Sequence, residues 1–453
     1  MRRTFIAPLE EWLISKDRKP LVIRGARQVG KTWLVRELAA ISTKKLIEFN
    51  FEKTPGLVSL FKSNDPHEIV RKIEERFSIK IEPSNSILFL DEIQSQPELL
   101  AKLRWFYEDM PELPVIAAGS LLELILGTHS FSMPVGRISF LYLEPLTFIE
   151  FLLALEKDRL VDVIKNFKWG NEINEAVHEE LMRLFKHYVY IGGLPSAVEN
   201  WINNYSLEKI NAIHQDLMGS YRADFGKYNV KVSDKTLNTI LDAIPRLLGD
   251  KVVFSKLDLT VSIEKNKEGF NLLSQARIIH KVQATAANGM PLQAEINPKF
   301  MKALLLDVGL CSTELGLTLD SLEDLEELIM VNKGAIAEQV TGQLLRTLQP
   351  WYIAPSLYYW VRLQQGSDAE VDYVIQHKGK IIPIEVKAGS EGTLRSLHQF
   401  MKLKKLSHAV RVYSGIPLIN NIGVKDKDGT AIKYELWSVP FYLISELPKL
   451  FTK

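Results

Sequence analysis

The chain has 453 residues, of which 46% are hydrophobic and 25% charged, with 56 basic against 55 acidic side chains and a formal net charge of +1. This composition excludes a mainly disordered chain, a collagen-like chain and a coiled coil, and the neutral total excludes a uniformly basic nucleic-acid wrapper. The length predicts about three domains. No uncharged apolar stretch reaches the roughly 18 residues that span a bilayer, and the N-terminus lacks a signal-peptide core. We therefore expect a cytoplasmic protein without a membrane partner.

The single cysteine, Cys311, cannot form an internal disulfide, which favours a reducing compartment. Cys311 follows the apolar run 303–310 and has no histidine nearby in the sequence. A buried structural cysteine is therefore favoured over a catalytic thiol, which stays open as the alternative.

A phosphate-binding motif follows the first predicted strand. Residues 20–24 form a short apolar run typical of a buried strand, and a helical pattern begins at the end of the motif. The motif G-x-x-x-x-G-K-T consists of Gly25, Ala26, Arg27, Gln28, Val29, Gly30, Lys31 and Thr32. Backbone N–H groups of such a loop, together with the helix N-terminus, bind phosphate oxygens. Lys31 is expected to reach the β- and γ-phosphates of ATP, and Thr32 to ligate Mg²⁺.

A second acidic motif ends another apolar run. Residues 86–90 are almost continuously hydrophobic, as expected of a central parallel strand that is covered on both faces. Asp91 and Glu92 follow directly. Asp91 is expected to hold Mg²⁺ through water and Glu92 to act as the general base that polarises the attacking water. An exposed acidic turn is the alternative interpretation.

Two further polar side chains are candidates for the same site. The strand predicted over 113–118 ends in Gly119-Ser120, where Ser120 would sense the γ-phosphate, although a plain Gly-Ser turn has the same sequence. Arg137 is a candidate arginine finger, acting in cis or on a neighbouring subunit of a homo-oligomer. A surface arginine is the alternative for Arg137.

These motifs resemble a prokaryotic family of AAA-type ATPases. The resemblance rests on residues 24–32, 90–94, 118–120 and 136–137, on Glu-Pro-Leu-Thr-Phe at 144–148, and on residues 190–195 and 306–310. It therefore covers nearly the whole chain. The resemblance implies an ATPase core followed by a C-terminal domain of undefined function with a nuclease-like fold.

The predicted fold class is α/β with four parts. Residues 1–150 form a P-loop AAA-type core with a parallel sheet, 151–235 a helical lid, 236–310 a winged helix, and 311–453 a PD-(D/E)xK nuclease-like α/β domain. The lid rests on helical patterns at 179–188 and 207–221, which the break Gly192-Gly193-Leu194-Pro195 separates.

The winged helix is predicted from a helix over 237–248 that Pro245 should end or kink, and from a hairpin that turns at Asn288-Gly289. Such domains often bind DNA, but many only pack against protein. The recognition segment, 269–281, carries only Arg277 and Lys281 as cations, which is few for a helix that reads phosphates.

Three strands are predicted in the C-terminal third, over 357–363, 370–376 and 380–386, the last two joined by a hairpin turn at 377–380. Side chains two residues apart share a face of a strand. Glu370 and Asp372 are therefore expected on one face of their strand, and Glu385 and Lys387 on one face of the next strand.

A helix carboxylate, an aspartate and Glu-x-Lys across a hairpin form the pattern of the PD-(D/E)xK phosphodiesterases. Asp372 and Glu385 are expected to bind a second Mg²⁺ or Mn²⁺, with support from Glu338 on the first turns of a predicted helix. Lys387 would be the catalytic cation. Alternating solvated strand faces are the alternative, and Val371 stands where the founding pattern has proline.

The leading functional hypothesis is Mg²⁺-dependent ATP binding and hydrolysis that controls a nuclease-like effector acting on DNA or RNA. From Lys380 to Arg411 there are seven basic and two acidic residues, a local balance of +5 that would suit a phosphate backbone, or a solvated helix face. The alternative hypothesis is an ATP-regulated module whose C-terminal domain binds a protein or nucleic acid without cleaving it. A phosphotransferring kinase is a third reading, and no acceptor-substrate domain supports it.

Overall fold

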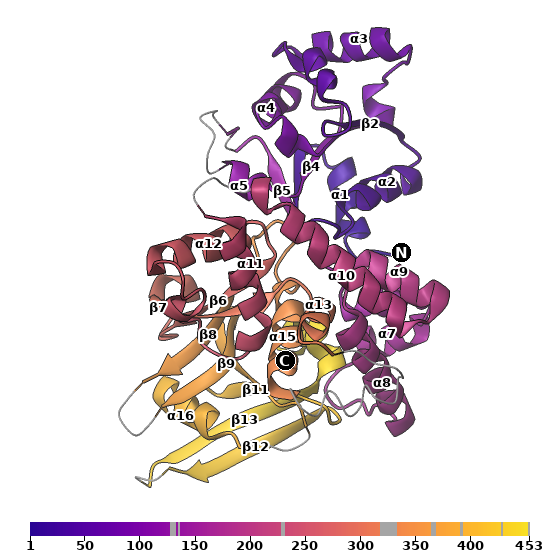
Figure 1. Cartoon of the computed structure of the whole chain (residues 1–453). Coiled ribbons are helices and arrows are strands. Elements are labelled where there is room, and N and C mark those ends of the chain that lie inside the picture. The colour runs from indigo at the N-terminus through magenta and orange to yellow at the C-terminus, as the bar shows by residue number, and fades with distance from the viewer. Residues whose placement is uncertain are drawn as a thin grey trace.

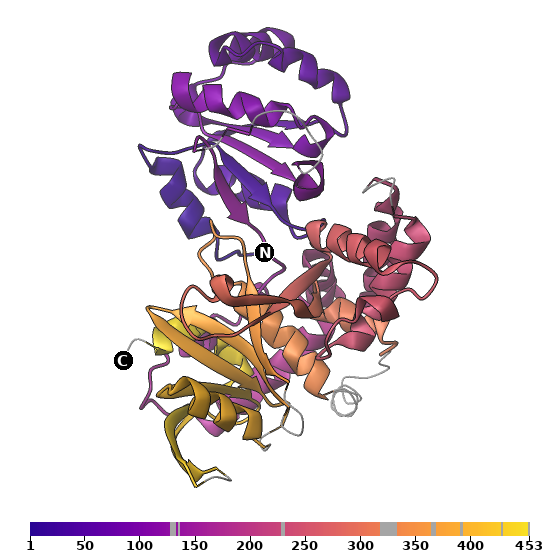
Figure 2. The same ribbon diagram turned by 90° about the vertical axis from the view of Figure 1, so that its left-hand side faces the viewer.

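The computed structural model describes residues 1–126, 133–134, 136–227, 232–317, 333–363, 368–389, 393–426 and 429–451. Two β-sheets lie at opposite ends of the molecule, and helices from the middle of the chain lie between and beside them (Figures 1 and 2). One continuous hydrophobic core includes residues of both sheets, such as Ile23 and Phe89 of the first and Ile384 and Val410 of the second. The two sheets are therefore joined by packed apolar side chains as well as by the chain.

The N-terminal sheet has five parallel strands, which confirms the predicted α/β P-loop core. Their spatial order is β2 (Lys45–Asn50), β3 (Ser86–Asp91), β4 (Val115–Gly119), β1 (Leu21–Arg24) and β5 (Ser139–Tyr142). Every residue of β3 and β4 is buried, because helices cover both faces of a parallel sheet. These helices are α1 (Ile6–Ile14), α2 (Lys31–Ile41), α3 (Pro66–Phe77), α4 (Leu99–Asp109) and α5 (Leu122–Leu126).

Five helices follow the first sheet: α6 (Phe148–Ala154), α7 (Asp158–Asn166), α8 (Glu175–Ile191), α9 (Pro195–Asn204) and α10 (Leu207–Ala223). The helices predicted over 179–188 and 207–221 are confirmed within α8 and α10. Gly192, with φ of 76°, ends α8, and Pro195 occupies the first turn of α9, where its missing N–H costs nothing.

The next segment begins with α11 (Asp234–Ala243), which gives way to a 3₁₀ turn at Pro245–Leu247, as the proline predicts. Helix α12 (Ile263–Gln275) leads into the antiparallel pair β6 (Ile279–Thr285) and β7 (Ile296–Leu305). Strand β6 also pairs with β8 (Leu357–Arg362), so the hairpin expected as a wing is built into the C-terminal sheet. The winged helix itself stays a prediction.

The second sheet is mixed and has eight described strands. Their spatial order is β12 (Leu418–Lys425), β13 (Ala431–Pro440), β11 (His408–Tyr413), β10 (Lys380–Val386), β9 (Ala369–His377), β8, β6 and β7. Strands β8, β9 and β10 confirm the three strands predicted in this third of the chain. The described helices after β7 are α13 (Val308–Glu314), α15 (Lys333–Arg346), α16 (Arg395–Lys404) and α17 (Leu447–Leu450).

Cys311 lies on α13 and is fully buried. Burial raises the pKa of its thiol well above the usual value, so the thiol stays protonated and unreactive. The structure thus supports a structural role for this cysteine. Among the helices of the described ranges, none combines the length and apolar character needed to cross a membrane.

Candidate functional site: a nucleotide cleft and a carboxylate cluster

The phosphate-binding loop runs from the end of β1 to the start of α2. Gly30 is the N-cap of α2 and has φ of 94°, a left-handed conformation that glycine adopts without strain. A Cβ at Gly25 would lie 2.5 Å from the carbonyl oxygen of Leu143. Both glycines of the motif are therefore required by the backbone path. This path brings the first turn of α2, with its free N–H groups, to the mouth of the loop.

Lys31 lies across this loop and is 7% exposed. Its ammonium donates hydrogen bonds to the carbonyl oxygens of Gly25 at 3.1 Å and Ala26 at 2.7 Å. Burial lowers the pKa of Lys31 to about 8, although the carboxylates of Glu92 and Asp91 oppose this shift. An anion in the loop would complete the charge compensation of this lysine.

Thr32 and Asp91 meet beside the loop, as expected for a magnesium site. The Thr32 hydroxyl donates to Asp91 Oδ2 at 3.1 Å, and Asn50 Nδ2 donates to the same oxygen at 3.3 Å. Burial and the neighbouring Glu92 raise the pKa of Asp91. A hydroxyl and a buried carboxylate in contact are hard oxygen donors that suit Mg²⁺. Asn50, at the carboxyl end of the strand next to β3, is a contributor that sequence reasoning missed.

Glu92 lines the same cleft and is held by Gln94. Gln94 Nε2 donates a hydrogen bond to Glu92 Oε2. A Cβ at Gly119 would overlap Gln94 Oε1, so the glycine leaves room for this amide at the tip of β4. Ser120 is 1% exposed, and its hydroxyl has no hydrogen-bond partner among the described residues. Gln94 was not identified as a site residue from the sequence, although it stands two positions after Glu92.

Of these residues, Lys31, Thr32 and Glu92 line a cleft of about 1540 Å³. Its walls come from the N-terminal segment, the phosphate-binding loop, α6, α7 and α9. The lining residues include Arg3, Arg27, Gln28, Val29, Gly30, Lys31, Thr32, Glu92, Leu153, Pro195 and Asn203. The phosphate-binding loop and Glu92 thus share the cleft with residues of α6, α7 and α9, and the cleft has room for a nucleoside triphosphate.

Arg137 does not line this cleft. Its Nε donates to Glu108 Oε1 on α4 at 2.8 Å, and the Arg137 side chain is 44% exposed. In this arrangement it acts on no group of its own chain's cleft. A role as an arginine finger would therefore require a neighbouring subunit.

The loop between α8 and α9 connects the cleft to the C-terminal half of the chain. Pro195 packs beside Gly30, since a Cβ on that glycine would lie 3.5 Å from Pro195 Cγ. Two residues earlier, the Gly193 N–H donates to Asp307 Oδ2 at 2.7 Å, and Gln343 Nε2 on α15 donates to the same oxygen at 2.9 Å. Burial raises the pKa of Asp307 to about 6, against the effect of these donors. One buried carboxylate thus ties the loop between α8 and α9 to α15.

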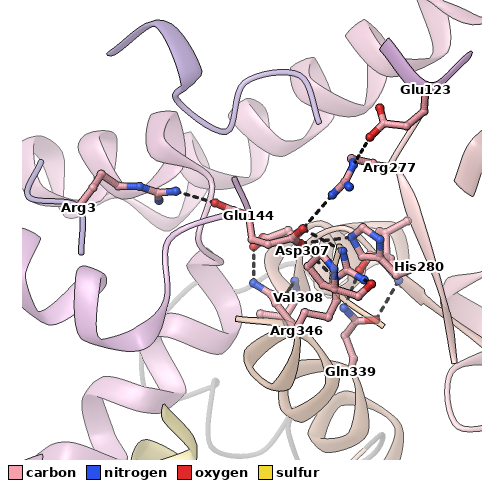
Figure 3. A network of polar contacts seen from close by, with 12 residues as sticks. Arg3, Glu123, Glu144, Arg277, His280, Asp307, Val308, Gln339 and Arg346 are labelled. Carbon is pink, nitrogen blue, oxygen red and sulfur yellow. Dashed lines mark hydrogen bonds and ion pairs between the residues drawn. The ribbon is translucent and has the colours of Figure 1, made fainter. Parts of the chain in front are cut away.

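A second buried network joins the two sheets around Glu144 (Figure 3). The Glu144 carboxylate accepts from Arg346 on α15 at 2.8 and 3.1 Å and from Arg277 at 3.1 Å. Arg277 also contacts Glu123 on α5 at 3.1 Å. Because Arg277 is engaged here, it is not available to DNA as a cation of the expected recognition segment.

In the C-terminal sheet, the predicted nuclease residues gather around α15, β9 and β10. Lys387 Nζ contacts Glu385 Oε1 at 2.8 Å, and Asp372 Oδ2 accepts from the Val386 N–H at 2.7 Å. Burial and then Glu385 raise the pKa of Asp372 to about 7, while burial and then Asp372 raise the pKa of Glu338 to about 7. The structure therefore brings the four side chains into one electrostatic cluster.

A lysine that the sequence did not suggest enters this cluster. Lys302 on β7 contacts Glu370 Oε1 at 2.5 Å and Glu338 Oε2 at 3.0 Å, and its side chain is 4% exposed. Lys251 contacts Glu370 from the other side at 3.6 Å. Both lysines come from the segment before the predicted domain boundary at residue 311.

We tested whether these residues fit the expected second metal ion. One observation favours it: Glu385 Oε2 is buried without a hydrogen-bond partner in the described residues. Two observations oppose it, because Lys302 lies between Glu338 and Glu370, and the described chain has no group of three His, Cys, Asp or Glu placed to hold an ion. The cluster does not fit the three-carboxylate metal site expected from the sequence.

The basic region 380–411 is partly engaged by contacts within the chain. Lys402 contacts Asp426 at 2.8 Å, and Lys404 donates to Asn288 at 2.6 Å. Arg411 stacks on the ring of Tyr413 at 4.5 Å. Less of its charge is therefore directed to an external phosphate backbone than the count of cations suggests.

Three family models match parts of the chain. Residues 17–152 match an AAA domain, residues 182–321 a domain of unknown function (DUF8612), and residues 333–424 another domain of unknown function (DUF4143). The AAA match covers the part of the chain that contains the phosphate-binding loop. No curated protein matches the chain.

Two solved structures of the Aeropyrum pernix ORC2 protein are similar to the chain. The structure with ADPNP and ADP is 12% identical, has a TM-score of 0.34, and the match covers 73% of this chain and 95% of that chain. The ADP form is 14% identical, with a TM-score of 0.30 and coverage of 72% and 93%.

Proposed function

We propose that the protein binds and hydrolyses Mg²⁺-ATP in the cleft between the N-terminal sheet and the lid, and that this reaction acts as a switch or motor controlling the C-terminal domain. The observation that carries the proposal is that Lys31, Thr32 and Glu92 line one cleft and that Thr32 donates a hydrogen bond to the buried Asp91. The match of this part of the chain to an AAA domain supports it.

The residues of the cleft have separate roles in this proposal. Thr32 and Asp91 would hold Mg²⁺, which supplies charge neutralisation between the β- and γ-phosphates. Lys31 leaves the loop carbonyls for phosphate oxygens, a step that its desolvated ammonium favours. Glu92, oriented by Gln94, positions the attacking water, and Ser120 donates its unused hydroxyl toward the γ-phosphate.

Two variants test this function. Lys31→Ala is expected to abolish ATP binding. Glu92→Gln is expected to retain ATP binding while turnover falls by about 10²-fold or more, because this variant removes the general base. Binding is measured with a fluorescent ATP analogue and turnover by phosphate release. Glu98→Gln, an exposed glutamate at the start of α4, is the matched control. Full turnover by Glu92→Gln would refute the assignment.

For the C-terminal domain, we propose a non-catalytic role in binding a protein or nucleic-acid partner under control of the ATPase. Lys302 favours this role, because an ammonium stands among the carboxylates that cleavage would need for metal. A nucleotide-dependent gel shift or pulldown tests it. Association that is equal with ATP, ADP and no nucleotide would contradict it.

Metal-dependent cleavage of DNA or RNA is the second candidate, favoured by the Lys387–Glu385 contact and the unpartnered Glu385 Oε2. It is tested by a matrix of cleavage assays with Mg²⁺ or Mn²⁺, with and without ATP, on the parent protein and Asp372→Ala. Cleavage that disappears in Asp372→Ala would establish it, and absence of cleavage under all conditions would exclude it.

A homo-oligomer belongs to the proposal if Arg137 acts as a finger. Arg137 is 44% exposed, so its surface ion pair with Glu108 can be exchanged for a neighbour's γ-phosphate. Sizing the protein with and without a non-hydrolysable ATP analogue tests this. A chain that remains a monomer in both states would remove Arg137 from the catalytic set.

A further inference from the structure

The carboxylate cluster of the C-terminal sheet is built around the ammonium of Lys302. This group contacts Glu370 Oε1 on β9 at 2.5 Å and Glu338 Oε2 on α15 at 3.0 Å. Its side chain is 4% exposed, so the ammonium is removed from bulk water. A buried ammonium requires paired carboxylates, and here two elements supply one each.

Two further ion pairs lie in the cluster, whereas Glu385 Oε2 is buried without a hydrogen-bond partner among the described residues. Lys251 contacts Glu370 Oε2 at 3.6 Å, and Lys387 contacts Glu385 Oε1 at 2.8 Å. Asp372 accepts the backbone N–H of Val386. The four carboxylates therefore face three ammonium groups, which leaves a formal charge of −1 and little attraction for a divalent cation.

The backbone around the cluster fits an internal junction. The β8–β9 register shifts by one residue between Val371 and Val374, which marks a bulge at Asp372. On the opposite side, Val252 N–H donates to Met301 O at 2.8 Å, so the segment of Lys251 is fixed to the strand of Lys302. Backbone hydrogen bonds therefore hold the two lysines side by side, and their side chains reach β9 and α15 through ion pairs.

We propose that Lys302 neutralises Glu338, one of the three carboxylates expected at the metal site, so that the cluster binds no metal and instead locks the segment before residue 311 onto the C-terminal sheet. The distances are those of ion pairs. Carboxylate oxygens lie at 2.5 and 3.0 Å from the ammonium, whereas Mg²⁺ and Mn²⁺ need oxygens at about 2.0–2.2 Å. Removal of the ammonium would leave the carboxylates of Glu338 and Glu370 without their shared counter-charge.

The test is Mn²⁺ binding to the full-length, nucleotide-free protein. Binding is measured as the loss of the electron paramagnetic resonance signal of free Mn²⁺. All proteins carry Asp91→Asn, which removes the contribution of the nucleotide cleft. In this background the parent and Asp372→Asn are expected to behave alike, with no Mn²⁺ bound at the cluster. Lys302→Met is expected to gain a bound Mn²⁺, and the added change Glu338→Gln to lose it. Lys299→Met, an exposed lysine on the same strand, should match the parent.

Two outcomes would overturn the proposal: Mn²⁺ binding by the parent that Asp372→Asn abolishes, or a folded Lys302→Met that gains no Mn²⁺. Circular dichroism establishes whether Lys302→Met folds. If it does not fold, the comparison of parent and Asp372→Asn decides alone. The measurement contains no nucleotide, so its failure leaves the proposed ATPase untouched.

Discussion

The variant Glu144→Gln removes the central charge of the buried network between the two sheets. Glutamine has almost the same shape as glutamate, so packing is kept while the guanidinium groups of Arg346 and Arg277 lose their counter-charge. The Glu144 residue is 5% exposed, and solvent cannot compensate the loss. We expect the variant to fold with lower stability.

The magnitude follows from the environment of the carboxylate. Burial alone would raise the pKa of Glu144, but Arg346, His280 and Arg277 together lower it from 4.5 to about 2. At 1.36 kcal/mol per unit, this corresponds to about 3 kcal/mol of stability at neutral pH. Removing one partner of a buried ion pair costs a similar amount, about 3–5 kcal/mol. For a chain of this length, about 3 kcal/mol lowers the melting midpoint by about 3 °C.

The same shift predicts the pH dependence. The pKa of Glu144 is depressed on folding, so its contribution is complete above about pH 4.5 and is lost as the pH falls through about 2. The difference between the parent and Glu144→Gln should therefore be constant around neutrality and should fall to about 1 kcal/mol near pH 3.

Thermal melting followed by circular dichroism, from pH 7 down to the lowest pH at which the parent remains folded, measures both effects. Glu10→Gln, an exposed position on α1, is the matched control. A midpoint for Glu144→Gln equal to that of the control would refute the reasoning. A difference that grows as the pH falls would refute it as well.

Three further predictions concern the cleft and the lid. Gly30→Ala places a side chain at φ of 94°, which costs roughly 1–2 kcal/mol, and should weaken the binding of an ATP analogue in a fluorescence titration. The control Gly136→Ala, at φ of 74° in open space, should leave this binding unchanged. Gln94→Leu should retain ATP binding and lower phosphate release, because Glu92 loses its orienting donor; unchanged release would remove Gln94 from the site. Gly193→Ala should lower the melting midpoint, because the new Cβ collides with the carbonyl of Leu146, whereas Gly219→Ala on α10 meets nothing and should be neutral or stabilising.

The nucleotide cleft was predictable because its chemistry is contiguous in the sequence. Gly25 to Thr32 form one loop between a strand and a helix, and Asp91 and Glu92 end one buried strand. Parallel strands bring their carboxyl ends to the same edge, so two local motifs define most of the cleft. Asn50 and Gln94 were missed because a single amide at a strand end or in a turn has no distinctive pattern.

By itself the sequence determined the α/β class, the phosphate-binding loop, and the strands β8, β9 and β10, of which β9 carries Asp372 and β10 carries Glu385. These features were predictable because periodicity and loop motifs act over a few residues. Only the tertiary structure decided that Arg346 meets Glu144 across 202 positions, that Lys302 and Lys251 enter the carboxylate cluster, and that β6 and β7 belong to the C-terminal sheet. Ion pairs between distant residues depend on which elements pack together, and no local period records that choice. The physical difference is therefore the sequence separation of the interacting residues. Local hydrogen bonding and amphipathicity depend on neighbouring residues, whereas buried ion pairs form only when distant elements pack together.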